Sequence, residues 1–156
     1  MNSDFSDLLR VLNEESVEYL IVGGYAVIKY TEPRFTKDID IWVNTSRDNA
    51  ERLMHALAKF GAPLSGILPE HFTDPELFFQ IGVSPMRIDI IMSIDGREFQ
   101  DCWPRRVAAN WDGVETNFIS LKDLIINKEA SGRPQDLIDL ENLKTAKIIV
   151  EKLNDE

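Results

Sequence analysis

Hydrophobic side chains recur along this chain in two spacings, one typical of helices and the other of strands. Near the start, apolar positions three or four residues apart predict an amphipathic helix over residues 4 to 16. Residues 19 to 23 (YLIVG) are a continuous apolar run, which predicts a buried strand, and residues 24 to 30 predict a short helix after a tight turn. Residues 38 to 43 (DIDIWV) alternate and are rich in β-branched side chains, which predicts a second strand.

The middle of the chain predicts one longer helix and two further strands. Ser46 is a predicted N-cap for a helix over residues 47 to 60, and the Gly- and Pro-rich residues 60 to 76 predict a long loop. Residues 77 to 83 and 87 to 94 predict two strands, joined by a hairpin turn at the Ser-Pro between them.

The last third of the chain predicts mainly helices. In chain order, the predictions are a helical segment over residues 97 to 109 that is interrupted by Pro104, a short strand over residues 114 to 119, a helix from a cap at Ser120 through Ala130 that ends at Gly132, and a final helix from Pro134 to about Leu153.

This order of elements predicts the α/β (α+β) class, with a small mixed β-sheet flanked by helices and a C-terminal helical hairpin. The 156 residues, 44% of them hydrophobic, are enough for one core. We therefore expect a single domain over residues 1–156, with a core of about residues 17–119 and a hairpin of about residues 120–153.

Charge and composition exclude several classes of function. A net charge of −10 argues against sequence-independent binding of nucleic acid by the whole surface, although a local basic pocket stays possible. The single cysteine, Cys102, forms no internal disulfide and indicates the reducing cytoplasm, where we expect it to be a packing residue. We find no signal peptide and no apolar stretch long enough for a membrane helix, so we expect no membrane partner.

Two aspartates stand one residue apart inside an otherwise apolar strand. Side chains alternate along a strand, so Asp38 and Asp40 point the same way. Asp89 has the same isoleucine neighbours in a second predicted strand, and three carboxylates would converge if the two strands pair. Carboxylates that close repel unless a cation lies among them, and oxygen ligands suit Mg²⁺ or Mn²⁺. Two such ions can hold the attacking and leaving oxygens of a phosphoryl or nucleotidyl transfer.

Gly23 and Gly24 end the first strand and begin the helix after it. Backbone N–H groups at a helix N-terminus bind phosphate, and glycine lets a phosphate come close. One short segment therefore predicts a phosphate site followed by a metal-binding pair.

Together these residues resemble the nucleotidyltransferase superfamily related to DNA polymerase β. Its pattern is a Gly-Gly or Gly-Ser helix start, then Asp-x-Asp on the next strand, then a third carboxylate on a later strand. The C-terminal LKDLIINKEASGRPQDLIDLENL is similar to the helical hairpin of small bacterial members, including AbiEii-type toxins of toxin–antitoxin systems. The resemblance runs from Tyr19 to Leu143 and implies that Lys128 and Arg133 approach the nucleotide, with Asp136 and Asp139 as further motif positions.

The resemblance implies a metal-dependent enzyme that moves the NMP of an NTP onto a hydroxyl of RNA, such as a tRNA end, or of a protein. Asp38 and Asp40 would hold Mg²⁺ or Mn²⁺, and Asp89 would complete the site and help to deprotonate the acceptor. An antitoxin partner or a homodimer would complete a chain that has no separate acceptor-binding domain. Two positions differ from the family pattern: Gly24 replaces a common phosphate-binding serine, and Gln135 replaces a common lysine.

Simpler interpretations stay open for each motif. The aspartates could lie on a solvated strand face, and the two glycines could form only a tight turn. Lys128 and Arg133 could merely pair with Asp136, a first-turn charge, for a few tenths of a kcal/mol.

Other charged and polar residues leave weaker alternatives. Arg34 and Lys37 flank the aspartates and could contact a triphosphate or be solvated loop charges. His55 and His71 have no cysteine partner nearby, so a zinc site is not expected. For the chain as a whole, the alternative to an enzyme is a non-catalytic binding partner or a nucleotide sensor that keeps the nucleotidyltransferase fold.

Overall fold

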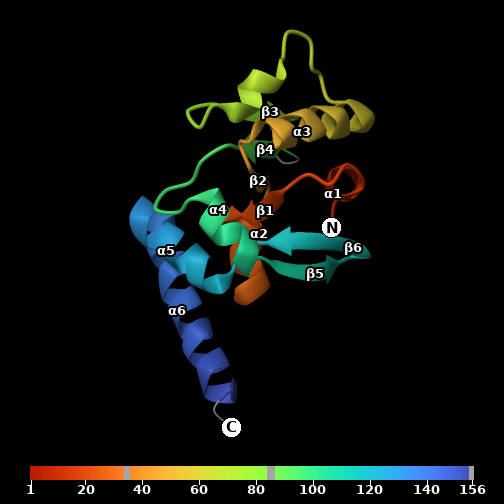
Figure 1. Cartoon of the computed structure of the whole chain (residues 1–156). Coiled ribbons are helices and arrows are strands. Elements are labelled where there is room, and N and C mark those ends of the chain that lie inside the picture. Colours follow the sequence, from red (N-terminus) through yellow and green to blue (C-terminus); the bar gives the residue numbers. More distant parts are fainter. Residues whose placement is uncertain (34–35, 84–86, 155–156) are drawn as a thin grey trace.

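The computed structural model describes residues 1–33, 36–83 and 87–154. No helix in these ranges is long and apolar enough to cross a membrane. Six strands form one sheet in the order β3-β4-β2-β1-β6-β5 (Figure 1). Their bounds are β1 Tyr19–Val22, β2 Ile39–Val43, β3 Phe78–Ile81, β4 Ile88–Ile91, β5 Val107–Trp111 and β6 Val114–Phe118.

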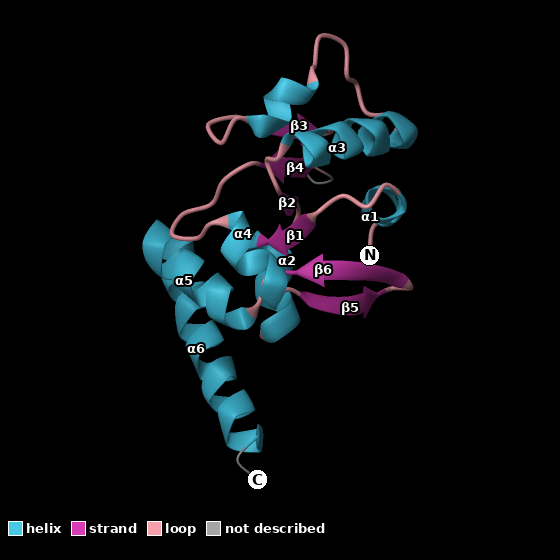
Figure 2. Ribbon diagram, viewed as in Figure 1, coloured by secondary structure: helices cyan, strands magenta, loops and turns pink. Residues whose placement is uncertain are grey.

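Helices surround this sheet (Figure 2). Their bounds are α1 Ser3–Glu14, α2 Gly23–Tyr30, α3 Arg47–Phe60, α4 Phe99–Cys102, α5 Leu121–Ser131 and α6 Pro134–Asn154, with 3-10 turns η1 Pro69–Thr73 and η2 Trp103–Arg105. β2 runs parallel to β4 and antiparallel to β1, β1 runs parallel to β6, and β3–β4 and β5–β6 are antiparallel pairs. The predicted fold class, a mixed sheet with flanking helices and a packed C-terminal pair, is confirmed.

Alternation along the strands gives the sheet two buried faces. Tyr19 and Ile21 of β1 pack in one core with α1 and α3, whereas Leu20 and Val22 pack in a second core with α2, α4, α5 and α6. On β2, Ile39 and Ile41 belong to the first core and Trp42 to the second. Asp40 therefore lies on the Trp42 face, on the side of the sheet that α2, α5 and α6 cover.

One segment was predicted wrongly. Residues 97 to 109 are not one interrupted helix: α4 has four residues, η2 follows, and β5 begins at Val107. The helix stops early because Pro104 cannot continue its hydrogen bonding. β5 pairs with β6 across a turn at Asp112 and Gly113, and Asp-Gly between apolar runs is a strong hairpin signal.

The predicted loop over residues 60 to 76 also contains the short η1 turn. The predicted turn between β3 and β4 falls on residues outside the described ranges.

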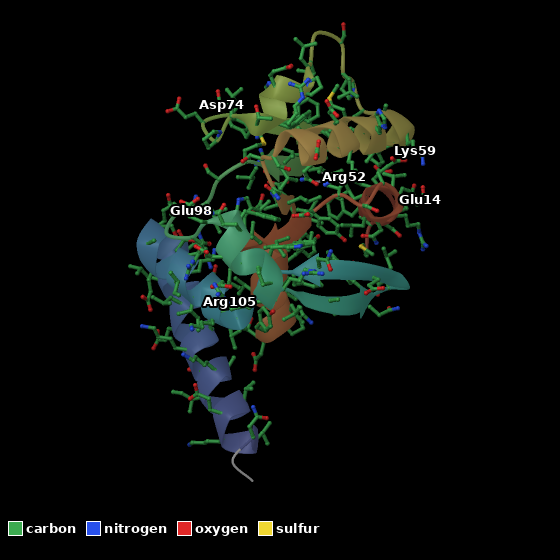
Figure 3. The ribbon with its side chains drawn as sticks, in the orientation of Figure 1. Glu14, Arg52, Lys59, Asp74, Glu98 and Arg105 are labelled. Carbon is green, nitrogen blue, oxygen red and sulfur yellow. The ribbon has the colours of Figure 1, made fainter. Side chains whose placement is uncertain are left out.

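An ion pair between a buried carboxylate and an exposed arginine fixes α5 to the segment before β5. Asp123 is fully buried and accepts hydrogen bonds from Arg105 Nε and Nη2 at 3.0 and 2.8 Å and from Ser120 Oγ at 2.9 Å. Arg97 Nη1 lies 3.5 Å from the same carboxylate. Burial alone would raise the pKa of Asp123, but these donors outweigh it and lower the pKa. Figure 3 shows Arg105 beside α5, the helix that carries Lys128.

Candidate active site

The strand register places two of the predicted carboxylates side by side. β2 and β4 are parallel neighbours, and Asp40 is the direct partner of Asp89. Asp38 stands two residues before Asp40 and on the same side of the chain. The two strands that carry Asp40 and Asp89 are therefore paired, which was the condition for the carboxylates to converge.

Burial and the neighbouring carboxylates disfavour the charged form of Asp40. The pKa of Asp40 is raised to about 7, first by burial, then by the charge of Asp89, a hydrogen bond shared with Asp89, and the charge of Asp38. The positive charge of Lys128 offsets part of this increase. A cation bound beside Asp40 would therefore stabilise its charged carboxylate against Asp38 and Asp89.

Arg87 also belongs to this cluster, and the sequence analysis missed it. Its Nη2 lies 3.0 Å from Asp38 Oδ2 and its Nε 3.1 Å from Asp89 Oδ1. The guanidinium therefore bridges the first and third predicted carboxylates. Arg87 is two residues before Asp89, on the same face, so the i, i+2 spacing was the available signal.

The carboxylate oxygens of Asp38, Asp40 and Asp89 are ligands of the type that a hard divalent cation prefers, but they are not arranged around a common point. Among the described residues, no group of three or more His, Cys, Asp or Glu side chains is arranged to hold a metal ion. The bridge from Arg87 gives a physical reason for this arrangement, because its guanidinium occupies the position between Asp38 and Asp89 that a metal ion would take. Asp89 Oδ1 is buried and lies 3.1 Å from Arg87 Nε, but the hydrogen bonds of Arg87 go to Oδ2, so Oδ1 has an ion-pair contact without a hydrogen bond and is an oxygen suited to Mg²⁺ or Mn²⁺ once Arg87 is displaced.

The helix after β1 begins at Gly23 with an uncapped N-terminus. Its N-cap residue, Val22, offers no side-chain hydrogen bond, whereas Asn2, Ser46 and Ser120 cap α1, α3 and α5. Gly24 lies in the first turn of α2. The first N–H groups of a helix have no partner within the helix, so this end suits an anion.

Gly23 has a specific steric role. Its φ is +68°, in the left-handed region, and a Cβ built on it would lie 2.2 Å from Asp40 Oδ2. The absence of a side chain at Gly23 therefore leaves space for the Asp40 carboxylate itself. The sequence had suggested only that the space was needed by a phosphate.

We predict that Gly23→Ala displaces Asp40 and reduces nucleotide transfer. Gly113→Ala is a matched control, because Gly113 has φ +88° and an added Cβ would meet nothing within 4 Å. Both variants should lose about 1–2 kcal/mol of stability from the left-handed backbone. Only Gly23→Ala should also lose transfer activity in a steady-state assay. Equal activity of the two variants would show that Gly23 forms only a turn.

The C-terminal hairpin brings two cations and two buried carboxylates together. Lys128 is buried at 6% exposure, and its Nζ lies 3.0 Å from Asp136 Oδ1 and 3.5 Å from Asp139 Oδ2. Asp136 also accepts from Arg133 Nε at 2.7 Å and from Ser131 Oγ at 2.8 Å. Burial alone would raise the pKa of Asp136, but these donors hold it well below its usual range.

These contacts change how we interpret the pairing of Lys128 and Arg133 with Asp136, and the substitution at Gln135. Lys128 and Arg133 do pair with Asp136, but Asp136 is buried at 2% exposure rather than being a solvated first-turn charge. The Lys128–Asp136 pair is therefore a buried ion pair, for which a few tenths of a kcal/mol is too small, whereas the Arg133 side chain that also pairs with Asp136 is 77% exposed. Gln135, which replaces the common lysine, donates to Asp139 at 3.0 Å and so helps to satisfy this buried carboxylate.

One cleft of about 290 Å³ gathers residues from these separate segments. Four predicted site residues line it: Gly23, Asp40, Lys128 and Arg133. Asp38 and Asp89 do not line it, but Asp89 is the strand partner of the lining residue Asp40, and Arg87 contacts both Asp38 and Asp89. The other lining residues, which the sequence analysis did not single out, are Val22, Ile91, Ser93, Ile94, Asp95, Asn127 and Ser131. Lys37 is exposed, and Arg34 lies outside the described residues.

A mixed sheet with paired strand carboxylates, a glycine helix start and a cationic helical hairpin is the arrangement of the nucleotidyltransferase class. The chain belongs to the DUF6036 family, nucleotidyltransferases of unknown function, which it matches over residues 4–155. No curated protein matches its sequence.

Solved structures share this fold at low sequence identity. The lincosamide antibiotic adenylyltransferase LnuA, with lincomycin bound, is 16% identical with a TM-score of 0.60, covering 94% of this chain and 98% of LnuA. ANT(2")-Ia in complex with adenylyl-2"-tobramycin is 14% identical with a TM-score of 0.58, covering 96% of this chain and 90% of the other. A nucleotidyltransferase-like protein from Paracoccidioides brasiliensis is 16% identical with a TM-score of 0.52, covering 87% of this chain and 71% of the other. At these identities the likeness shows the fold alone.

Proposed function

We propose that the chain transfers the NMP of an NTP to a hydroxyl of an acceptor molecule. The acceptor oxygen attacks the α-phosphorus, the bond from that phosphorus to the oxygen bridging it to the β-phosphate breaks, and pyrophosphate leaves. The observation that carries the proposal is the cleft that joins Gly23 of α2, Asp40 of β2, and Lys128 and Arg133 of the C-terminal hairpin.

Each part of the cleft has a role in this reaction. The N–H groups at the start of α2, beside Gly23 and Gly24, bind the β- and γ-phosphates. Arg133 and Lys128 add positive charge on the opposite wall, held in position by Asp136. Asp89 does not line the cleft, but it is the strand partner of Asp40 and would take part in accepting the proton of the attacking hydroxyl once Arg87 no longer pairs with it.

A divalent cation completes the charge balance. Asp38, Asp40 and Asp89 would hold Mg²⁺ or Mn²⁺, which would neutralise the negative charge of the phosphates during transfer. The raised pKa of Asp40 supports this role, because a carboxylate crowded by its neighbours favours a bound cation.

We propose that the acceptor is a molecule with a free hydroxyl group. RNA, such as a tRNA end, and a protein side chain follow from the resemblance to AbiEii-type toxins, and an antitoxin or a second copy would then complete the site. LnuA, which shares the fold, is a lincosamide antibiotic adenylyltransferase, and ANT(2")-Ia was solved with adenylyl-2"-tobramycin. The test therefore also includes a small-molecule acceptor. The single domain over residues 1–156 and the cytoplasmic location stay predictions.

The test is transfer of label from an NTP in a cell lysate that contains the acceptor. NTP labelled at the α-phosphate should mark an acceptor in the presence of Mg²⁺, and NTP labelled at the γ-phosphate should not. Label from the γ-phosphate would indicate a phosphoryl transfer instead. Mg²⁺-dependent NTP binding with no α-label on any acceptor would favour the nucleotide-sensor alternative.

A further inference from the structure

Within the described ranges, the Arg87 side chain is in direct contact with both Asp38 and Asp89. Its Nη2 is 3.0 Å from Asp38, and its Nε and Nη2 are 3.3 and 3.2 Å from Asp89 Oδ2. The Arg87 side chain is 35% exposed, whereas the side chains of Asp38 and Asp89 are 24% and 12% exposed. The guanidinium is therefore more exposed to solvent than either carboxylate it contacts.

This position allows Arg87 to replace a cation in the metal-free protein. Three carboxylates in one cluster repel, and a guanidinium that bridges two of them lowers that repulsion. A divalent ion that shares the same oxygens cannot keep a guanidinium beside it, because both charges are positive. Arg87 must move away before Asp38 and Asp89 can bind the ion.

We infer that Arg87 is an internal counter-ion that competes with the divalent metal and so sets how tightly the three-aspartate site binds it. This inference rests on the proposed function, since it assumes a metal at Asp38, Asp40 and Asp89. Arg87 is a positioning residue: it holds two carboxylates in the metal-free state and releases them when the ion enters.

The test compares binding of Mn²⁺ alone, by calorimetry, in three forms of the full chain. Arg87→Gln removes the charge and the bridge, and it should bind Mn²⁺ at least about tenfold more tightly than the wild type. Arg47→Gln is the matched control, because Arg47 lies on α3 and pairs with Glu51 and Glu70 rather than with the three aspartates. The same charge is lost there, but the Mn²⁺ affinity should not change.

A second measurement uses no metal. With EDTA present, Arg87→Gln should lower the melting temperature by roughly 3–5 °C, because the carboxylates lose their counter-ion. Adding Asp38→Asn to Arg87→Gln should restore part of that loss, since the repulsion is smaller. If Arg87→Gln does not fold, Arg87→Lys keeps the charge without the two-sided bridge and should bind Mn²⁺ with intermediate affinity.

The two failures can be told apart. Equal Mn²⁺ affinities for the wild type and the Arg87 variants would overturn the counter-ion role and leave the metal site standing. If neither binds Mn²⁺, with or without NTP, both the counter-ion role and the proposed metal-dependent transfer are wrong.

Discussion

The double substitution Asp38→Asn and Asp40→Asn should abolish nucleotide transfer and stabilise the metal-free protein. Asparagine keeps the shape of each side chain but removes two negative charges from the cluster that includes Asp89. Transfer should fall by at least about 100-fold, the loss typical when a group that stabilises transition-state charge is removed. Stability should move in the opposite direction, because fewer carboxylates repel in the folded state.

The stabilising part of this effect depends on pH. The folded pKa of Asp40, about 7, lies above its ordinary value of 3.8. Between these two values the unfolded chain has released the proton and the folded chain has not, so rising pH costs the wild type stability through this window. The full cost applies above about pH 7. Removing the carboxylate should therefore raise the free energy of unfolding by roughly 2–4 kcal/mol at pH 8 and by clearly less at pH 5.

Thermal unfolding at both pH values, with EDTA and with Mn²⁺, separates the two contributions. In EDTA at pH 8, the melting temperature of the double variant should be higher than that of the wild type. With saturating Mn²⁺ the order should reverse, because only the wild type gains stability from the ion. A variant that binds Mg²⁺ and ATP as well as the wild type would contradict the metal-binding role of the aspartates.

Much of the fold could be predicted because local pattern and tertiary structure agree. Ser46 and Ser120 cap helices as predicted, each accepting from the backbone N–H three residues on. The alternation in DIDIWV correctly placed Asp40 on the face away from Ile39 and Ile41. The strand β5 was missed, because its Val-Ala-Ala-Asn-Trp run has weak β propensity and follows a prolyl turn.

Candidate site residues could be predicted only where one segment supplies its own signal. Asp-x-Asp and Gly-Gly are local patterns, so their residues could be proposed from the sequence. The contact between the Gly23 backbone and Asp40, and the bridge from Arg87 to Asp38, join segments that pair only in the folded sheet. The burial of Asp136 depends likewise on how α5 packs against α6, side by side in Figure 1, which no spacing in the sequence specifies.

Lys128→Met should destabilise the protein and reduce transfer together. Met matches the length of the lysine stem, but it leaves Asp136 and Asp139 buried with fewer donors. Breaking a buried ion pair from one side costs up to about 3 kcal/mol here, because Asp136 loses its buried cation while Arg133 and Ser131 continue to donate to it. Transfer should fall as well, because Lys128 lines the cleft and its charge reaches Asp40.

The neighbouring helix offers a matched control in Lys144→Met. Lys144 lies on α6 and pairs with Glu129 at 3.5 Å, but both side chains are at least half exposed. Its loss should change the free energy of unfolding by less than about 0.5 kcal/mol and leave transfer unchanged. Denaturant unfolding of the two Met variants then measures the effect of burial with the chemistry of the substitution held constant.

A double-mutant cycle decides whether the Lys128 effect comes from the pair or from lost packing. If the buried charge on Asp136 is the cause, Asp136→Asn should recover part of the stability that Lys128→Met loses, and the two costs will not add. Additive costs would mean that each side chain contributes through packing alone. Transfer separates from stability in the same cycle: the Asp136→Asn background should restore folding but not activity, because the cleft still lacks the charge of Lys128. Recovery of both together would show that Lys128 acts only by holding the hairpin.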